Sequence, residues 1–267
     1  MKLSGWYVGL TLLGLCSSSW AGQGPNPQEI SIRAMYYSGT GCPNGTVHGM
    51  LSADGNWLIA RFDKFLAKDG PSYDRADRRK SCTLTMDLRV PAGFAFSVFQ
   101  LDTLGHLKLD RGTSADQKVS VRFAGDDLNN SASFPHRYEG PRTGYFLTSD
   151  KAAVASAVWS TCGGGKPLNV TTALTASAEG GGAEAIIGVD VQAGRLEHRF
   201  AIMWKRCDGS GTVILPNPAQ VQCSDIPPDD RYTCVEQASW NKCDAVWMQA
   251  YCDRSCGRCS PSAGQLD

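Results

Sequence analysis

Polar and apolar residues alternate along most of the chain between Ile30 and Cys207. The alternation is clearest over residues 31–36, 83–90 and 118–123, where β-branched and aromatic side chains are frequent. A period of two is typical of strands that bury one face and expose the other. The pattern therefore predicts a mainly β domain.

Short groups of turn-forming residues separate the predicted strands. They are rich in Gly, Asn, Asp and Pro, and they lie at residues 44–45, 54–55, 91–93, 163–165 and 180–182. About ten short strands joined by such turns favour an antiparallel β-sandwich, with a closed barrel as the alternative. Only Lys151–Val158 also fits a short helix.

The last part of the chain has a different composition, because six of the eleven cysteines lie there within 37 residues. A segment of this length buries too little apolar surface to fold on its core alone, so disulfides must supply stability. Six cysteines allow fifteen pairings, and their spacing does not select one. The six are Cys223, Cys234, Cys243, Cys252, Cys256 and Cys259.

These patterns divide the chain into parts. Residues 22–207 are the predicted β-domain, and residues 223–259 are the cysteine-rich segment. Residues 208–222 between them are rich in Gly, Pro and polar side chains, which is typical of a linker. Residues 1–21 are a predicted signal peptide, and residues 260–267 are a polar tail.

The N-terminus has the features of a signal peptide. Lys2 precedes an apolar run at Trp6–Cys16, and small residues on both sides of Trp20 place cleavage after Ala21. The run is shorter than the roughly 20 residues that span a bilayer, so we expect no transmembrane segment after cleavage. A retained anchor is the alternative. We therefore expect a secreted, extracellular protein.

The remaining cysteines agree with an oxidising compartment. Cleavage would remove Cys16 and leave ten, an even number that full pairing requires. In the β-domain the simplest pairing is sequential, with Cys42 bonded to Cys82 and Cys162 bonded to Cys207.

Three sequons and the net charge bear on the expected partners. Asn44, Asn129 and Asn169 each begin an Asn-x-Ser/Thr sequon and are candidate glycosylation sites, although chance sequons are the alternative in this chain. The formal net charge is zero. We therefore expect neither a nucleic acid nor an anionic membrane surface as the partner.

The cysteine-rich segment contains several motifs in a fixed order, which are Cys223-Ser-Asp225, Trp247-Met248 and Cys252-x-x-Ser255-Cys256-Gly257-x-Cys259. Together they resemble the ShKT domain, a family named after a sea anemone potassium-channel toxin. The resemblance implies that the first cysteine pairs with the sixth, the second with the fourth and the third with the fifth. The implied disulfides are Cys223–Cys259, Cys234–Cys252 and Cys243–Cys256.

A short helix is predicted within this segment, with Asp244 as its N-cap. Trp247 and Tyr251 are four residues apart, as are Met248 and Cys252, so each pair would share one helical face. We expect Trp247, Met248 and Tyr251 to contribute to binding. We also expect Asp225 to pair with Arg254, because the implied disulfides bring the ends of the segment together.

The charge of the segment departs from that of the resembling toxins, which plug a channel with a lysine on a basic surface. Gln249 follows Met248 where that lysine is expected, and Lys242 is the only lysine between Cys223 and Cys259. Six acidic residues stand against four basic ones there. An acidic module approaches a cation-selective vestibule unfavourably, which disfavours an ion channel as the partner.

The β-domain also contains a series of short motifs. They are Gly41-Cys42-Pro43, Arg79-Lys80-Ser81-Cys82, Pro91-x-Gly93-Phe94, Gly140-Pro141, Cys162-Gly163-Gly164, Leu168-Asn169-Val170 and Trp204-x-x-Cys207. From about Ile30 to Cys207 they resemble a family of small secreted proteins, mostly fungal and bacterial, catalogued as domain of unknown function 4360. The resemblance implies a β-rich fold with two disulfides and brings no activity.

No catalytic arrangement is recognisable in the sequence. The histidines match no metal-binding spacing, and no Gly-x-Ser-x-Gly motif occurs. Each cysteine of the mature chain has a disulfide role, so no thiol nucleophile remains. We expect no enzyme activity, cofactor or metal. The alternatives are a calcium site that includes Asp126-Asp127 and a carboxylate pair assembled by the fold. The four histidines are His48, His106, His136 and His198.

These observations favour a secreted, non-enzymatic interaction protein of the cell surface or wall. The β-domain would present the binding face to an extracellular protein or glycan, and the ShKT-like segment would be an accessory module. A toxin-like ion-channel effector and a secreted hydrolase are the alternatives.

Overall fold

The computed structural model describes residues 24–52, 54–127, 130–179, 182–189, 196–216, 225–228, 232–245, 248 and 251–259. The predicted signal peptide and the polar tail lie outside these residues, as do Asn129, Cys223 and Trp247.

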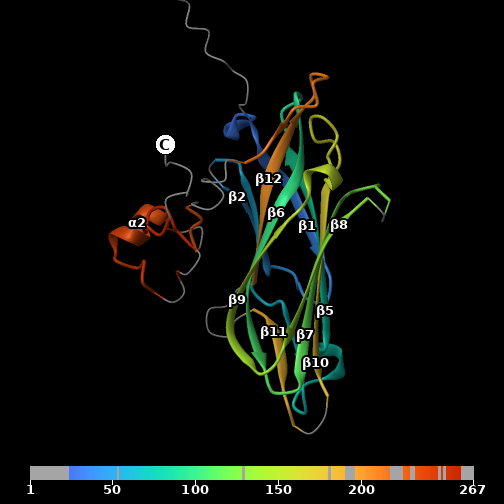
Figure 1. The fold of residues 1–267 in the computed structure, drawn as a ribbon, viewed down its shortest axis with the longest axis vertical. Helices are drawn as coiled ribbons and strands as arrows, with labels where there is room; N and C mark the ends of the chain where they lie inside the picture. The colour runs from blue at the N-terminus through green and yellow to red at the C-terminus, as the bar shows by residue number, and fades with distance from the viewer. Residues whose placement is uncertain are drawn as a thin grey trace, which may run out of the picture.

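Two antiparallel sheets pack face to face, which confirms the predicted β-sandwich (Figure 1). Sheet A has the order β1-β5-β10-β7-β8, formed by Ser31–Ser38, Arg79–Arg89, Leu168–Ala178, Thr113–Phe123 and Ala132–Glu139. Sheet B has the order β2-β3-β12-β6-β11-β4, formed by Val47–Leu51, Trp57–Phe62, Leu196–Arg206, Phe94–Leu109, Ala185–Gly188 and Leu66–Asp69. Two more strands join sheet B, β9 (Arg142–Lys151) beside β6 and β13 (Val213–Ile214) beside β12.

The helical elements are short. The described residues contain three 3-10 helices, η1 (Pro27–Glu29), η2 (Arg75–Asp77) and η3 (Val154–Ser156), and the α-helix α2 (Cys234–Ser239) in the cysteine-rich segment. The predicted range of the short helix at Lys151–Val158 is wrong. Lys151 ends β9, and within this range only Val154–Ser156 is helical.

The core lies between the sheets and follows the sequence pattern closely in sheet A. In β5 the buried residues Leu84, Met86 and Leu88 alternate with partly exposed ones. The largest buried side chains include four phenylalanines from sheets A and B, Phe62, Phe96, Phe123 and Phe200. The alternation arises because successive side chains of a strand point to opposite faces.

A buried histidine joins the two sheets. His198 on β12 has its Nδ1 atom 3.0 Å from Thr103 Oγ1 and its Nε2 atom 3.0 Å from Thr172 Oγ1. Thr103 belongs to β6 of sheet B, whereas Thr172 belongs to β10 of sheet A. Burial lowers the pKa of His198 to about 3, although the nearby Glu197 charge acts in the opposite direction. The imidazole is therefore neutral at ordinary pH.

Two disulfides join loops of the sandwich to the strands β5 and β12 or to the residue that follows them. Cys42 is bonded to Cys82, and Cys162 is bonded to Cys207, which are the pairs expected from sequential pairing. Gly39 precedes the first disulfide with a φ of 139°, and a Cβ atom there would lie 2.2 Å from the carbonyl oxygen of Ser81. Only glycine allows this close approach of the two backbones.

The predicted linker is ordered at its start. Beyond Cys207 the chain turns back and forms β13, in which Val213 pairs with Lys205 and Ile214 pairs with Trp204 of β12. The Asp208 carboxylate accepts hydrogen bonds from the backbone N–H and hydroxyl of Ser210 in the turn, and these bonds lower its pKa. Residues 217–224 lie outside the described residues.

Candidate functional site

The cysteine-rich segment packs against the outer face of sheet B. We call residues 225–259 the C-terminal segment. Its buried residues Ile226, Met248 and Tyr251 form one apolar cluster with Trp57 and Ile59 of β3 and Ala201 of β12. Figure 1 shows the segment, with α2, on the side of the sandwich that β2, β12 and β6 form. The part of the outer face of sheet B that β3 and β12 form is therefore occupied by the protein's own chain.

A buried ionic cluster lies in the same interface. The Glu197 carboxylate, which has no exposed surface, accepts hydrogen bonds from the Nε atoms of Arg61 (2.6 Å) and Arg199. The Tyr251 hydroxyl donates to the same carboxylate at 3.2 Å, and its ring lies 4.8 Å from the Arg199 guanidinium carbon. Arg61 also donates to the backbone carbonyl of Pro227. Both partners of this network, the sheet and the C-terminal segment, supply buried polar groups.

Desolvation disfavours the charged form of Glu197, but the two arginines outweigh it, so the pKa of the carboxyl lies below its ordinary value. Glu197 is thus ionised between two cations. Removing one member of such a cluster is strongly destabilising, because it leaves buried charge without compensation.

The C-terminal segment is held internally by disulfides. Cys234 is bonded to Cys252 and Cys243 to Cys256, which are two of the pairs that the ShKT resemblance implies. Cys259 is also disulfide-bonded, and Cys223 lies outside the described residues.

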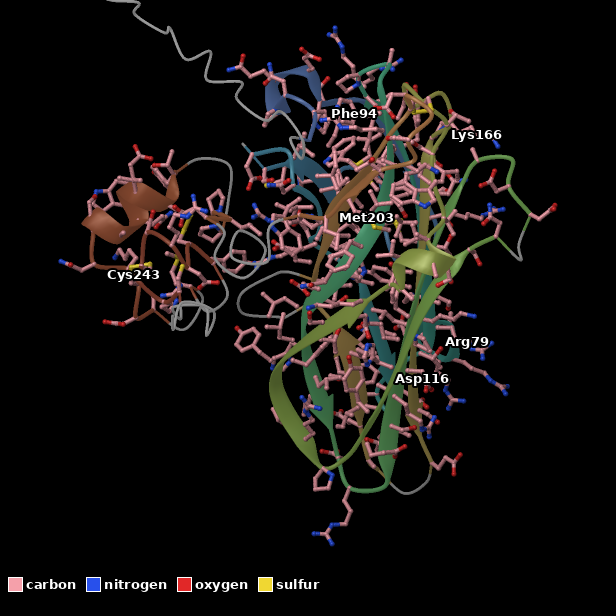
Figure 2. The ribbon with its side chains drawn as sticks, turned by 45° about the horizontal axis from the view of Figure 1, so that its top comes forward. Arg79, Phe94, Asp116, Lys166, Met203 and Cys243 are labelled. Atoms are coloured by element: carbon pink, nitrogen blue, oxygen red, sulfur yellow. A yellow bond between two sulfur atoms is a disulfide. The ribbon has the colours of Figure 1, made fainter. Side chains whose placement is uncertain are left out.

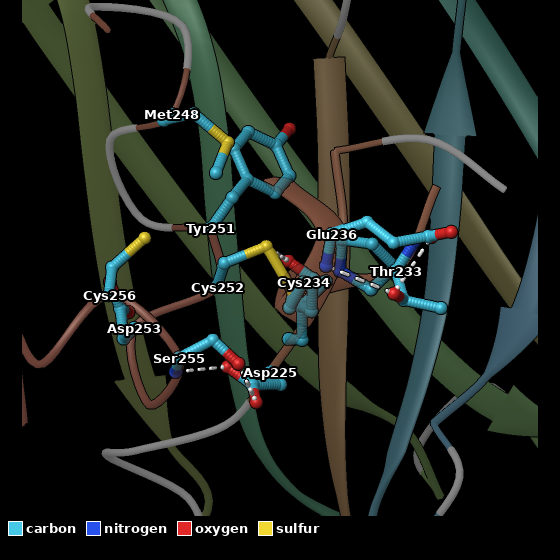
Figure 3. Close-up of a disulfide and its surroundings, with 12 residues drawn as sticks. Asp225, Thr233, Cys234, Glu236, Met248, Tyr251, Cys252, Asp253, Ser255 and Cys256 are labelled. Atoms are coloured by element: carbon cyan, nitrogen blue, oxygen red, sulfur yellow. Dashed lines mark hydrogen bonds between the residues drawn. A yellow bond between two sulfur atoms is a disulfide. The ribbon is translucent and has the colours of Figure 1, made fainter. Parts of the chain in front are cut away.

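The ends of the segment are joined by hydrogen bonds and not by the expected ion pair. The Asp225 carboxylate accepts from the backbone N–H (2.8 Å) and the hydroxyl (2.7 Å) of Ser255, as Figure 3 shows beside the Cys234–Cys252 disulfide. Among the described residues no ion pair joins Asp225 to Arg254. The expected ion pair is therefore wrong, because the neighbouring serine supplies two donors to the carboxylate.

The sequence missed the helix that the structure describes in this segment. Helix α2 begins after Thr233, whose hydroxyl accepts from the Glu236 N–H at 3.3 Å while the Glu236 carboxylate accepts from the Thr233 N–H at 2.7 Å. This capping box is visible in the sequence as Thr-x-x-Glu and could have located the helix. The helix expected after Asp244 falls largely on residues outside the described ones.

Two of the three expected binding residues are not accessible to a partner. Met248 is 0% exposed and Tyr251 is 4% exposed, because both pack against sheet B. Trp247 lies outside the described residues. The segment instead exposes three other apolar side chains around α2, and the rings of two of them, Tyr232 and Trp240, lie 5.0 Å apart. The third is Val235.

The outer face of sheet A carries a continuous row of hydroxyl groups. The strand register places one Ser or Thr from each of the five strands side by side, and the Thr83 and Thr171 hydroxyls are 3.1 Å apart. The side chains lie on the face opposite to the core, because their neighbours along each strand are the buried ones. The row consists of Ser38, Thr83, Thr171, Ser120 and Ser133.

A second row of side chains lies beside the hydroxyl row. It begins with Tyr36 on β1, which is 70% exposed, and continues with Thr85, Asn169 and Arg122. The Thr85 hydroxyl donates to Asn169 Oδ1 at 2.9 Å, which fixes the orientation of the amide. The Asn169 amide nitrogen then points its donors away from Thr85. This row combines an exposed aromatic ring, an amide and a guanidinium group.

On the other side of the hydroxyl row, the face is hollowed. The hollow has a volume of about 420 Å³, and its wall includes Arg79 and Ser81 of β5 and Asp116 and Lys118 of β7. The small side chain of Ala173 lies between these strands on β10. Figure 2 shows Arg79 and Asp116 on the side of the sandwich away from the C-terminal segment, which carries the Cys243 label.

The other candidate residues from the sequence are dispersed. His48 bonds Asp63 (3.0 Å) and His136 bonds Asp150 (2.7 Å), while His198 is in the core. His106 contacts the Tyr145 ring.

The Asp126 carboxylate accepts hydrogen bonds from Lys166 (2.7 Å) and Asn130 (3.0 Å). One of the two carboxylates of the alternative calcium site is therefore already engaged. Within the described ranges, no group of three or more His, Cys, Asp or Glu side chains is arranged to hold a metal ion.

Two of the three sequons are described. Asn44 is exposed in a turn, whereas Asn169 lies within a central strand of sheet A.

The fold and its disulfides define a β-sandwich protein of the extracellular type. The chain belongs to the family described as "Domain of unknown function (DUF4360)", whose model matches residues 28–207. An "Uncharacterized secreted protein" of Arthroderma benhamiae is 34% identical over 186 residues, which cover 70% of this chain and 75% of that one. The protein is secreted, as expected, and no helix in the described part of the chain is long and apolar enough to cross a membrane.

Solved structures show only weak likeness. The enzymatically active domain of bacteriophage CBA120 tailspike protein 4 matches with a TM-score of 0.23 and 12% identity, over 64% of this chain and 19% of that one. A xylanase 10B fragment of Clostridium thermocellum matches with a TM-score of 0.23 and 10% identity, over 65% of this chain and 26% of that one. The chain thus spans about a fifth to a quarter of these structures.

Proposed function

We propose that the protein is a secreted, non-enzymatic glycan-binding protein of the cell surface or wall, and that the outer face of sheet A is its binding face. One observation carries the proposal. Sheet A presents aligned hydroxyl, amide and charged groups with an exposed tyrosine, whereas the outer face of sheet B is covered at β3 and β12 by the C-terminal segment.

The chemistry of this face suits a sugar chain. Sugar hydroxyls need donors and acceptors in fixed positions, and the hydroxyl row, Asn169 and Arg122 supply both. The Tyr36 ring supplies an apolar surface for the C–H face of a pyranose ring. Since the groups stand on five paired strands, little conformational entropy is lost when a ligand binds.

The same face offers little to a hydrolase. A glycosidase needs two carboxyl groups on either side of the scissile bond, one as a base or nucleophile and the other as a proton donor, and both must be accessible to the substrate. The carboxylates of sheet A are engaged instead, Asp87 with Arg33 (3.9 Å) and Asp116 with Arg137 (3.2 Å). These ion pairs support binding without catalysis.

The C-terminal segment completes the proposal as an ShKT-like accessory module. In this view residues 22–207 are the β-domain, 208–222 the linker, 223–259 the module and 260–267 the tail. The third disulfide is Cys223–Cys259. The burial of Met248 and Tyr251 against sheet B supports a role in covering this face and opposes a channel effector that acts through them.

A glycan array probed with the secreted full-length protein tests the function. We expect binding to one group of glycans, and we expect Tyr36→Ala to weaken it by about tenfold or more, since stacking and hydrogen-bonding contacts each contribute around 1 kcal/mol. Tyr145→Ala is the matched control, because Tyr145 is an exposed tyrosine on sheet B. Absence of binding to every glycan, or equal losses in both variants, would refute the proposal.

The sequon at Asn169 provides a second test. An N-glycan attached there would cover the centre of the proposed binding face, whereas a glycan at Asn44 would extend from an exposed turn. Peptide mapping of protein secreted by a eukaryotic host is expected to find Asn169 unmodified. If Asn169 were fully glycosylated in a protein that still binds glycans, the binding site could not lie on this face of sheet A.

A further inference from the structure

We propose that the glycan bound by sheet A is acidic, and that Arg79 and Lys118 form an anion subsite in the hollow while Arg122 contacts a second anionic group beyond the hydroxyl row. The inference rests on the proposed function and deepens it. It names the class of ligand as a chain that carries sulfate, phosphate or carboxylate groups.

The first support is the pairing of charges on this side of the sandwich. The acidic groups on the strands of sheet A have cationic partners, as do two in adjoining loops: Asp116 lies 3.2 Å from Arg137, Asp77 lies 2.8 Å from Lys80, and Asp126 lies 2.7 Å from Lys166. The carboxylate of Asp87 has Arg33 beside it, and Glu139 bonds Arg137.

Four cations of the same face remain without such partners, the three of the proposed site and Arg89 at the end of β5. Across the described part of the chain, no ion pair or side-chain hydrogen bond involves Arg79, Lys118 or Arg122. All three are at least partly exposed, and each stands on sheet A with the orientation of the outer face. The face therefore has an excess of available positive charge, although the whole chain has a formal net charge of zero.

The second support is the placement of the three cations. Lys118 and Arg122 are four residues apart on β7, which corresponds to about 13 Å along a strand. Ser120, a member of the hydroxyl row, lies between them on the same face. Arg79 stands two strands away from β7, about 10 Å across the sheet. Cations thus lie on both sides of a row that would hold sugar hydroxyls.

The third support is the shape of the hollow. Ala173 has too small a side chain to fill the space between β5 and β7, so an anionic group can enter there. Arg79 and Lys118 lie on its wall, and Ser81 and Thr175 supply hydroxyl donors. Guanidinium and ammonium groups bind such oxyanions with charge-assisted hydrogen bonds, which are the strongest type available at a surface.

Affinity electrophoresis of the full-length protein tests the inference, with dextran sulfate, polygalacturonate and unmodified dextran as probes. We expect retardation by at least one of the two polyanions, and a loss of affinity as salt rises from about 50 to about 200 mM. The double variant Arg79→Gln, Lys118→Gln should lose about tenfold in affinity for the polyanion, since two charge-assisted contacts are removed. The sulfate and carboxylate probes distinguish the two sources of negative charge.

The control variant removes equal charge from other surfaces. Arg254→Gln with Lys151→Gln should leave the affinity for the polyanion unchanged, because Arg254 lies in the C-terminal segment and Lys151 ends β9 of sheet B. An equal loss in the control would mean a general charge effect and would overturn the subsite. Equal retardation by single-stranded DNA would overturn the assignment to glycans.

The outcomes separate this inference from the proposed function. If Tyr36→Ala abolishes binding to a neutral glycan while polyanions do not bind, sheet A is the binding face and the anion subsite is wrong. If neither neutral nor acidic glycans bind, both proposals are wrong.

Discussion

Acidification should destabilise the protein through His198, the histidine that is buried between the two sheets. Its pKa is lowered to about 3 by burial, whereas an unfolded chain has a histidine pKa of about 6.5. Between these values the unfolded state binds a proton that the folded state excludes. The contribution of the neutral imidazole to stability is therefore fully present above about pH 6.5 and is lost as the pH falls.

The size of the effect follows from the two pKa values. Each pH unit below the unfolded pKa costs about 1.4 kcal/mol, until the folded pKa is reached. Lowering the pH from about 7 to about 4.5 should thus remove about 2.5 kcal/mol of the free energy of unfolding. The carboxylates that titrate in the same range are shared by wild type and variant, so they cancel in a comparison of the two.

The comparison uses His198→Gln, which keeps one donor and one acceptor for Thr103 and Thr172 but does not titrate. Urea unfolding with intact disulfides, followed by tryptophan fluorescence, gives the free energy of unfolding at both pH values. The advantage of wild type over the variant should shrink by about 2.5 kcal/mol on acidification. His106→Gln is the control for loss of a histidine outside the core. A wild-type advantage that is the same at both pH values would refute the reasoning.

Three further predictions concern the C-terminal segment. Glu197→Gln should lower the free energy of unfolding by about 3–5 kcal/mol, because it leaves Arg61 and Arg199 buried without their counter-charge; a loss below about 1 kcal/mol in urea unfolding would contradict the buried cluster. Tyr251→Phe should cost about 1.5–3 kcal/mol through the lost hydrogen bond to a charged group, read by the same unfolding assay; an unchanged unfolding midpoint would show that this bond is not made. Non-reducing peptide mapping should recover Cys223 bonded to Cys259 and no disulfide between the segment and the β-domain. One abundant disulfide across the linker would contradict the prediction that the two parts of the chain form their disulfides independently.

The sequence predicted sheet A well, because its strands have one buried face. In β5 the alternation of apolar Leu84 and Met86 with polar Thr83 and Thr85 is the direct result of that arrangement. The pairing Cys42–Cys82 was also the simplest available, and the structure contains it. Local pattern and global fold agree at these positions.

The same reasoning fails for β12, which has no such alternation of buried and exposed residues over most of its length. The strand extends over Leu196–Arg206, and its first nine residues are buried irrespective of their polarity, including Glu197 and Arg199. In the sequence, the two charged residues look like part of an exposed loop, because nothing local shows that another segment covers the strand. Only the tertiary contact with the C-terminal segment, across a large separation along the chain, explains its burial.

The prediction that Met248 and Tyr251 contribute to binding failed for the same reason. Met248 and Tyr251 share a pattern that fits a recognition surface, and nothing local reveals that the surface is already occupied by sheet B. The hydroxyl row on sheet A was hidden for a related reason. Its five members are isolated Ser and Thr residues, and only the register between strands aligns them.

The packing of the C-terminal segment on sheet B should be reflected in the sequences of related proteins. All six residues of β3 are buried, including Trp57 and Ile59 on the outer face, and this is tolerable only while the C-terminal segment lies over them. A family member that ends after its β-domain would present both side chains to water, at a cost in solubility. Homologues without the cysteine-rich tail should therefore carry polar residues at these two positions, and gain or loss of the tail should coincide with their replacement.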